Sequence, residues 1–136
     1  MSEEQGEKVA AEVAEAEFQR FLDAMDLDHD EEGMDEEDLK SFQKEKARVV
    51  KAIQDGRMSI DEKGQPTFQP TDGEPITFRE PRGSTLMAMD SKKKNHDVTK
   101  LFATMAEMTK VPVQKFSKMP NRDLKVCLAV TLLFLG

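Results

Sequence analysis

The spacing of hydrophobic positions along this 136-residue chain changes twice, at Gly56 and at Gly83. Before Gly56, apolar residues recur every three or four positions, which predicts helices over residues 8–25 and 38–55. Between residues 57 and 79, short runs alternate apolar and polar side chains, which predicts strands. Helical spacing then returns. The pattern predicts an α+β fold with two parts: an acidic helical arm over residues 1–55, and a domain over residues 57–136 in which a small antiparallel sheet precedes a helical body.

Turn-forming residues set the limits of these elements. Gly56 is a good C-cap for the second helix. Lys63-Gly64 suits the turn of a hairpin between residues 58–60 and 67–68, and residues 76–79 form a third short strand. Three nearby prolines limit how regular the sheet can be, because proline donates no hydrogen bond to a ladder. They are Pro66, Pro70 and Pro75.

Four helical segments are predicted after Gly83. A short one covers residues 84–90, and an amphipathic helix over residues 97–110 carries one apolar stripe. A short turn of helix follows over residues 112–118, with Pro112 at its first position. The last helix starts at Asn121, a capping residue, and Asp123 suits the positive end of its dipole. The apolar stripe of the amphipathic helix contains Val98, Leu101, Phe102, Met105 and Met108.

The last helix is apolar on every side. Its sequence from Leu124 to Leu135 is LKVCLAVTLLFL, and such a helix must be covered by something. At about twelve residues it is too short to cross a bilayer, which takes about 20. It therefore fills the core of this chain or is covered by a partner. The residues expected to share that core or to bind the partner are Met105, Met108, Leu124, Leu128, Leu132 and Leu135, together with Leu101, Phe102 and Phe116.

Charge is distributed unevenly although the formal net charge is only −7. Residues 1–38 hold sixteen acidic and two basic side chains, whereas residues 39–136 hold eleven acidic and eighteen basic ones. An acidic segment of this kind favours solubility over nucleic-acid binding. The run Lys92-Lys93-Lys94 is short and has no aromatic neighbour, so we expect no nucleic-acid site there.

One segment has the character of a metal site. Asp26, Asp28 and Asp30 lie between two predicted helices, at the spacing of the first ligands of an EF-hand loop. Glu31 stands at the sixth position, where that loop needs glycine for a sharp turn. Read with one inserted residue, Gly33 fits better and Asp38 closes the loop. The three aspartates are weak metal candidates, and a solvated acidic linker is the favoured interpretation.

Catalytic motifs are missing from the sequence. No GxSxG, P-loop, HExxH or glycine-rich dinucleotide turn occurs, so we expect a protein that is not an enzyme and needs no cofactor. Cys127 is the only cysteine and falls in the apolar last helix, where a buried side chain is expected. The first residues lack the basic and then apolar pattern of a secretory signal, which favours the cytoplasm.

From Gly64 onward, the order of short motifs resembles the tail assembly chaperones of long-tailed bacteriophages. A hairpin ends in GQPTFQP, and the strand and break ITFREPRGSTLMAMD follow. An amphipathic helix then ends in LFATMAEMTKVPVQKF, and the last helix opens with MPNRDLKV. The similarity covers about the C-terminal half, and the acidic helical arm departs from the short forms of that family.

This resemblance implies a chaperone that binds the tape measure protein, a long apolar helical protein. In the host cytoplasm it would hold that protein in solution while tail tube subunits assemble around it, and it could also contact the tail tube protein. Methionine and leucine at helical spacing suit such a client. Two alternatives from other classes stay open. One is a regulatory binding protein built on a degenerate EF-hand-like loop, and the other is a structural subunit of a homo-oligomer. No membrane partner is expected.

Overall fold

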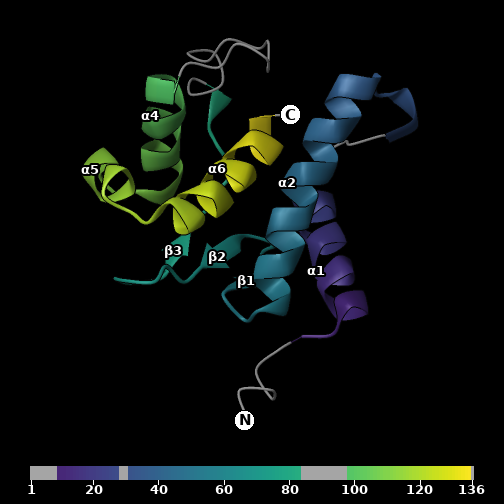
Figure 1. Ribbon diagram of the computed structural model, residues 1–136, viewed down its shortest axis with the longest axis horizontal. Coiled ribbons are helices and arrows are strands. Elements are labelled where there is room, and N and C mark those ends of the chain that lie inside the picture. Colours follow the sequence, from purple (N-terminus) through teal and green to yellow (C-terminus); the bar gives the residue numbers. More distant parts are fainter. Residues whose placement is uncertain (1–8, 28–30, 84–97, 136) are drawn as a thin grey trace.

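The computed structural model describes residues 9–27, 31–83 and 98–135. A small antiparallel sheet lies along the lower side of the molecule in Figure 1, with helices above and beside it. The predicted α+β fold is therefore confirmed. The short helix expected over residues 84–90 lies outside the described residues, as do Asp28, Asp30 and the lysine run. The change from helix to strand after Gly56 falls where the spacing of apolar residues predicted it.

Two helices form the first half of the described chain. Helix α1 spans Ala11–Ala24, a 3-10 turn η1 spans Glu31–Gly33, and helix α2 spans Glu36–Gln54. Helix α2 begins two residues before the predicted start, because the Asp35 carboxylate accepts a hydrogen bond from the Asp38 N–H at 2.8 Å and caps it. Asp35 is one of several consecutive acidic residues, so the sequence did not indicate which of them caps the helix. Gly56 follows with φ +80°, as a C-cap glycine should.

The sheet has three short strands in the order β1-β2-β3, all antiparallel. Strand β1 is Met58–Ile60, β2 is Pro66–Phe68 and β3 is Ile76–Thr77. Met58 pairs with Phe68, and Phe68 pairs with Ile76, so one row of apolar side chains faces the core. Lengths of two or three residues agree with the limit that the prolines were expected to impose.

Helix α1 is fastened to the hairpin. The Arg20 guanidinium donates hydrogen bonds to the carbonyl oxygens of Ile60 at 2.6 Å and Asp61 at 2.8 Å. The hairpin turn lies so close to α1 that a Cβ added to Gly64 would be 2.2 Å from the Cβ of Ala24. Gly64 also has φ +84°. Glycine is therefore required here by both backbone conformation and close approach.

Three further helices complete the described fold: α4 is Val98–Thr109, α5 is Val113–Ser117 and α6 is Asn121–Leu135. The predicted start of α5 was wrong by one residue, because Pro112 is its N-cap rather than its first residue. The predicted start of α6 at Asn121 is confirmed, but Asn121 is its first residue rather than its cap. The Pro120 carbonyl accepts the N–H groups of Asp123 and Leu124 instead.

All of these helices and strands except the 3-10 turn η1 contribute to one cluster of buried apolar side chains. Helix α6 packs chiefly against α2 and also against α4 (Figure 1). The Phe134 ring of α6 meets the Phe21 ring of α1 edge to face, with centroids 5.3 Å apart. The described part of the predicted acidic arm is thus built into the same core as the helical body, and no second core begins at residue 57.

Candidate functional site

The residues expected to bind a partner fall into two groups by exposure. Met105 and Met108 are 0% and 2% exposed, so of the two roles expected for them the structure places both in the core. Leu124, Leu128 and Leu132 are half-buried, as is Leu135. These four leucines are three or four residues apart and lie along one side of α6. Helix α6 is covered mainly by its own chain, which answers the question that its sequence raised.

The uncovered part of that side borders a groove. Two adjoining hollows, of about 400 and 290 Å³, lie between α2 and α6 and share Arg48 and Lys125 in their walls. We call them together the α2–α6 groove. Its apolar floor is formed by Ala52, Val126, Leu128, Ala129 and Leu132.

The two helices run in opposite directions along the groove. One hollow joins the end of α2 near Asp55 to the start of α6 near Arg122, and the other joins Ser41 to Leu132. From Ser41 to Asp55 a helix advances about 21 Å at 1.5 Å per residue. The groove is therefore long enough for about four turns of a partner helix.

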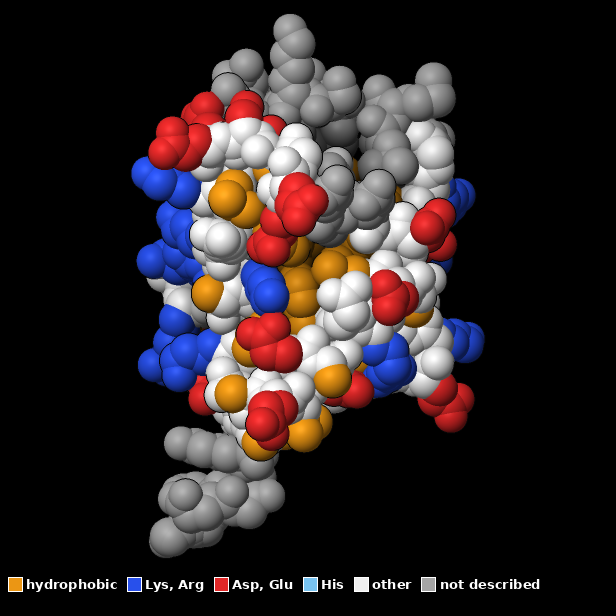
Figure 2. All heavy atoms as spheres, turned by 90° about the vertical axis from the view of Figure 1, so that its right-hand side faces the viewer, with side chains coloured by type: hydrophobic (Ala, Val, Ile, Leu, Met, Phe, Trp, Pro, Cys, Tyr) orange, Lys and Arg blue, Asp and Glu red, His pale blue; other side chains and the backbone are white. Residues whose placement is uncertain are grey.

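Basic side chains line this groove in a protein whose net charge is negative. Its walls hold six cationic side chains and two acidic ones, Glu45 and Asp55. The cations follow the helical period: Lys44, Arg48 and Lys51 on α2, and Arg122 and Lys125 on α6, with Arg57 at one end. Figure 2, where the side of the molecule formed by α1 and α2 faces the viewer, shows Lys and Arg side chains in a column along the left edge.

A buried ion pair fixes the start of α6 beside the sheet. The Asp123 side chain is 0% exposed, and its Oδ1 accepts a hydrogen bond from the Arg57 guanidinium at 2.5 Å. The Thr71 N–H donates to Asp123 Oδ2 at 2.8 Å, and the Arg57 guanidinium carbon lies 5.1 Å from the centre of the Phe68 ring. We call Arg57, Thr71 and Asp123 the α6 latch. Arg57 also lines the groove, so the latch sets one end of its wall.

Ionisation of the latch follows from these contacts. Burial alone would raise the pKa of Asp123, but the hydrogen bonds from Thr71 and Arg57 outweigh burial, and its pKa lies below the ordinary value. Sequence reasoning placed Asp123 only at a helix dipole and missed Arg57, which lies 66 positions away. One turn further along α6, burial and then the nearby Asp123 charge raise the pKa of the Cys127 thiol to about 12, so this cysteine is protonated and unreactive.

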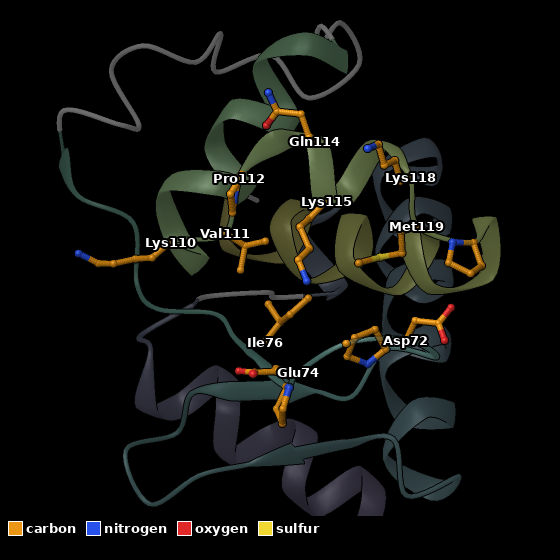
Figure 3. A pocket seen from close by; sticks show the side chains of 14 residues that line it. Asp72, Glu74, Ile76, Lys110, Val111, Pro112, Gln114, Lys115, Lys118 and Met119 are labelled. Atoms are coloured by element: carbon orange, nitrogen blue, oxygen red, sulfur yellow. The ribbon is translucent and has the colours of Figure 1, made fainter.

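A third hollow, of about 590 Å³, lies between the loop before β3 and the turn from α4 to α5 (Figure 3). Lys115 extends from α5 across this space toward Ile76, whereas Lys110 points away from it. Asp72 and Glu74 lie on the loop side, so the walls carry both signs of charge. No candidate predicted from the sequence lies in this hollow.

The predicted metal segment is only partly described. Asp26 is exposed and has φ +56°, whereas Asp28 and Asp30 lie outside the described residues. Over residues 9–27, 31–83 and 98–135, no three His, Cys, Asp or Glu side chains lie close enough together to hold a metal ion. Within the same ranges, no helix combines the length and apolar character that a membrane span requires.

Comparison of the chain with models of known protein families, with curated proteins and with solved structures finds no match. The site must therefore be interpreted from its own chemistry. It is an elongated groove with an apolar floor and basic walls, next to a latch that holds one of its two helices in place.

Proposed function

We propose that this protein is a tail assembly chaperone of a long-tailed bacteriophage, a binding protein rather than an enzyme. It binds helical segments of the tape measure protein in the α2–α6 groove and keeps them in solution in the host cytoplasm until the tail tube surrounds them. The observation that carries the proposal is the half-buried pair Leu128 and Leu132 on the groove floor. Laying an amphipathic helix into such a groove is a common mode of recognition.

The resemblance to tail assembly chaperones, from Gly64 onward, supplies the client, and the groove supplies the means of binding it. A chaperone for an apolar helix needs apolar surface that stays accessible while its own core is closed. Leu128 and Leu132 meet this need because each is only half-buried. The buried residues Val130 and Leu133 on the same helix meanwhile hold α6 in the core.

Point substitutions are a better test than truncation. Removing residues 120–136 would take Val130, Leu133 and Phe134 out of the core, so a loss of binding would report unfolding. We therefore compare the double variant Leu128→Gln/Leu132→Gln with Val98→Gln/Val113→Gln. Val98 and Val113 are 65% and 38% exposed and lie outside the groove, which makes them a matched apolar control.

Each variant is co-expressed with a tape measure protein, and the fraction of that protein in the supernatant is measured. The groove variant should lose most of the tape measure protein to the pellet, while the control variant and the unchanged chain keep it in solution. Equal solubility with both variants would refute the proposal, provided that circular dichroism shows both to be folded. A stable homo-oligomer whose interface requires Leu128 and Leu132, measured by mass without a client, would favour a structural subunit.

A further inference from the structure

We infer that the segment held in the α2–α6 groove is an amphipathic helix with an acidic edge. Its apolar side chains would lie on Leu128 and Leu132, and its carboxylates would face Arg48 and Lys125. This inference rests on the proposed function for the position of the binding surface, and adds the chemical class of the bound segment. Because the walls of this groove are basic, the contact includes charge as well as apolar surface.

The order of side chains along α6 gives the bound helix a direction. The groove side of α6 begins with Arg122 and Lys125 and continues with Leu128 and Leu132, at steps of three or four residues. The α6 side of the groove is thus basic at its start and apolar toward its end, whereas the α2 side also carries Lys44 and Arg48 opposite the two leucines. A complementary segment carries acidic residues toward the start of α6 and apolar residues toward its end.

Most of these cations have no acidic partner within the described part of the chain. Ion pairs join Lys51 to Asp55 at 3.3 Å and Arg57 to Asp123 at 2.5 Å. Over the same described ranges, none joins Lys44, Arg48, Arg122 or Lys125 to a carboxylate. Glu45 and Asp55 balance only part of the positive charge along the groove, so the cations repel one another, and a bound row of carboxylates would relieve that repulsion.

A nucleic acid is the other polyanion that a basic groove could bind, and three features favour a protein segment. The net charge of −7 opposes a long polyanion. Among the described residues that line the groove, none has an aromatic side chain on which a base could stack. Leu128 and Leu132 on the floor instead suit aliphatic side chains.

The test uses the full chain and three synthetic helical peptides of about 18 residues, a length that covers the groove at 1.5 Å per residue. All three share one leucine stripe. The residues beside the stripe are glutamate in the first, glutamine in the second and lysine in the third. We expect the glutamate peptide to bind about tenfold more tightly than the lysine peptide at about 50 mM salt, and this ratio to shrink at about 500 mM because exposed charges are screened.

Charge reversal in the groove supplies the second arm. Arg48→Glu/Lys125→Glu is compared with Lys63→Glu/Lys100→Glu, which changes two exposed lysines outside the groove by the same charge. The groove variant should bind the glutamate peptide about tenfold more weakly and the lysine peptide more tightly, whereas the control should keep the original order. Tighter binding of the lysine peptide requires a folded groove. This result therefore distinguishes an effect of the reversed charge from unfolding of the variant.

Equal affinity for the three peptides, or an unchanged order in the groove variant, would overturn the inference. Tighter binding of a single-stranded oligonucleotide than of the glutamate peptide would overturn it as well. The two proposals can fail separately. If charge reversal leaves tape measure solubility unchanged while Leu128→Gln/Leu132→Gln abolishes it, the acidic edge is wrong and the function stands. If peptide preference follows the groove charge but no variant changes tape measure solubility, the groove chemistry stands and the chaperone function is wrong.

Discussion

Replacing Asp123 with asparagine tests how far the α6 latch stabilises the fold. The substitution keeps the shape of the side chain and removes its charge. It removes the ion pair with Arg57. It also leaves only one side-chain oxygen, whereas in Asp123 both oxygens accept hydrogen bonds, Oδ1 from Arg57 and Oδ2 from the Thr71 N–H. Because Asp123 is fully buried, water cannot replace the lost contacts at the carboxylate.

The magnitude follows from the burial of the two partners. Breaking a buried ion pair costs about 3–5 kcal/mol. Arg57 is 32% exposed and can turn its charge toward water, so the cost should lie at or below the lower limit of that range. We expect a loss of about 2–3 kcal/mol in the free energy of unfolding, with hydrogen bonds to charged groups worth about 1.5–3 kcal/mol each. For a chain of this size, that lowers Tm by about 6–12 °C.

Chemical denaturation followed by circular dichroism measures this loss. The matched control is Asp72→Asn, an exposed carboxylate on the neighbouring loop, which should change the free energy by less than about 0.5 kcal/mol. A difference of under 0.5 kcal/mol between Asp123→Asn and the unchanged chain at neutral pH would show that the latch adds little.

The pH dependence has a definite sign. The pKa of Asp123 is lower in the folded chain than its ordinary value. Its contribution to the free energy of unfolding is therefore complete above the pKa of the unfolded state. That contribution is lost as the pH falls through the folded pKa. The difference in unfolding free energy between the unchanged chain and Asp123→Asn should be constant above about pH 5 and should disappear below about pH 4. A gap that widens with acid would contradict the assigned direction.

Three further substitutions or treatments follow from the packing. Gly64→Ala should cost about 2 kcal/mol or more in unfolding free energy, because of positive φ and the clash with Ala24; Gly83→Ala, with open space around it, is the control. Cys127 should react with a thiol reagent in native protein only at the rate of unfolding, because its pKa is raised to about 12 and it is buried; rapid labelling in buffer would contradict this. Phe134→Ala should destabilise by about 3–5 kcal/mol through loss of a core ring, and an unchanged denaturation midpoint would place that ring outside the core.

Helix and strand positions were predictable because each depends on local spacing. Phe18, Phe21 and Leu22 recur at helical steps, and all three are buried on α1. The hairpin was predictable from the turn at Gly64 between two apolar runs. Helix ends were predicted less well. Asp35 caps α2 with a carboxylate that several neighbouring acidic residues also carry, and Pro120 acts through a backbone carbonyl that every residue has.

The latch and the groove depend on contacts between distant residues, so local spacing could not reveal them. Arg57 follows a helix-ending glycine and has no local feature that points to Asp123. The all-apolar pattern of α6 likewise fits burial in this chain and burial in a partner equally well. The structure shows that α6 is covered within this chain, chiefly by α2, whose Val49 and Ile53 are buried in the common core. Once α6 lies against α2, however, the basic residues of both helices fall on one groove.

Helix α2 shows why the core and the groove can be varied independently. Val49, Val50 and Ile53 are buried on one side, whereas Lys44 and Arg48 line the groove on another. At 3.6 residues per turn, positions 44, 48 and 51 recur on one stripe, which the apolar positions 49, 50 and 53 do not share. Charge on the groove stripe can therefore be reversed without placing a charge in the core. The expectation is that groove variants change the preferred peptide while unfolding free energy stays nearly constant, and that core variants do the opposite.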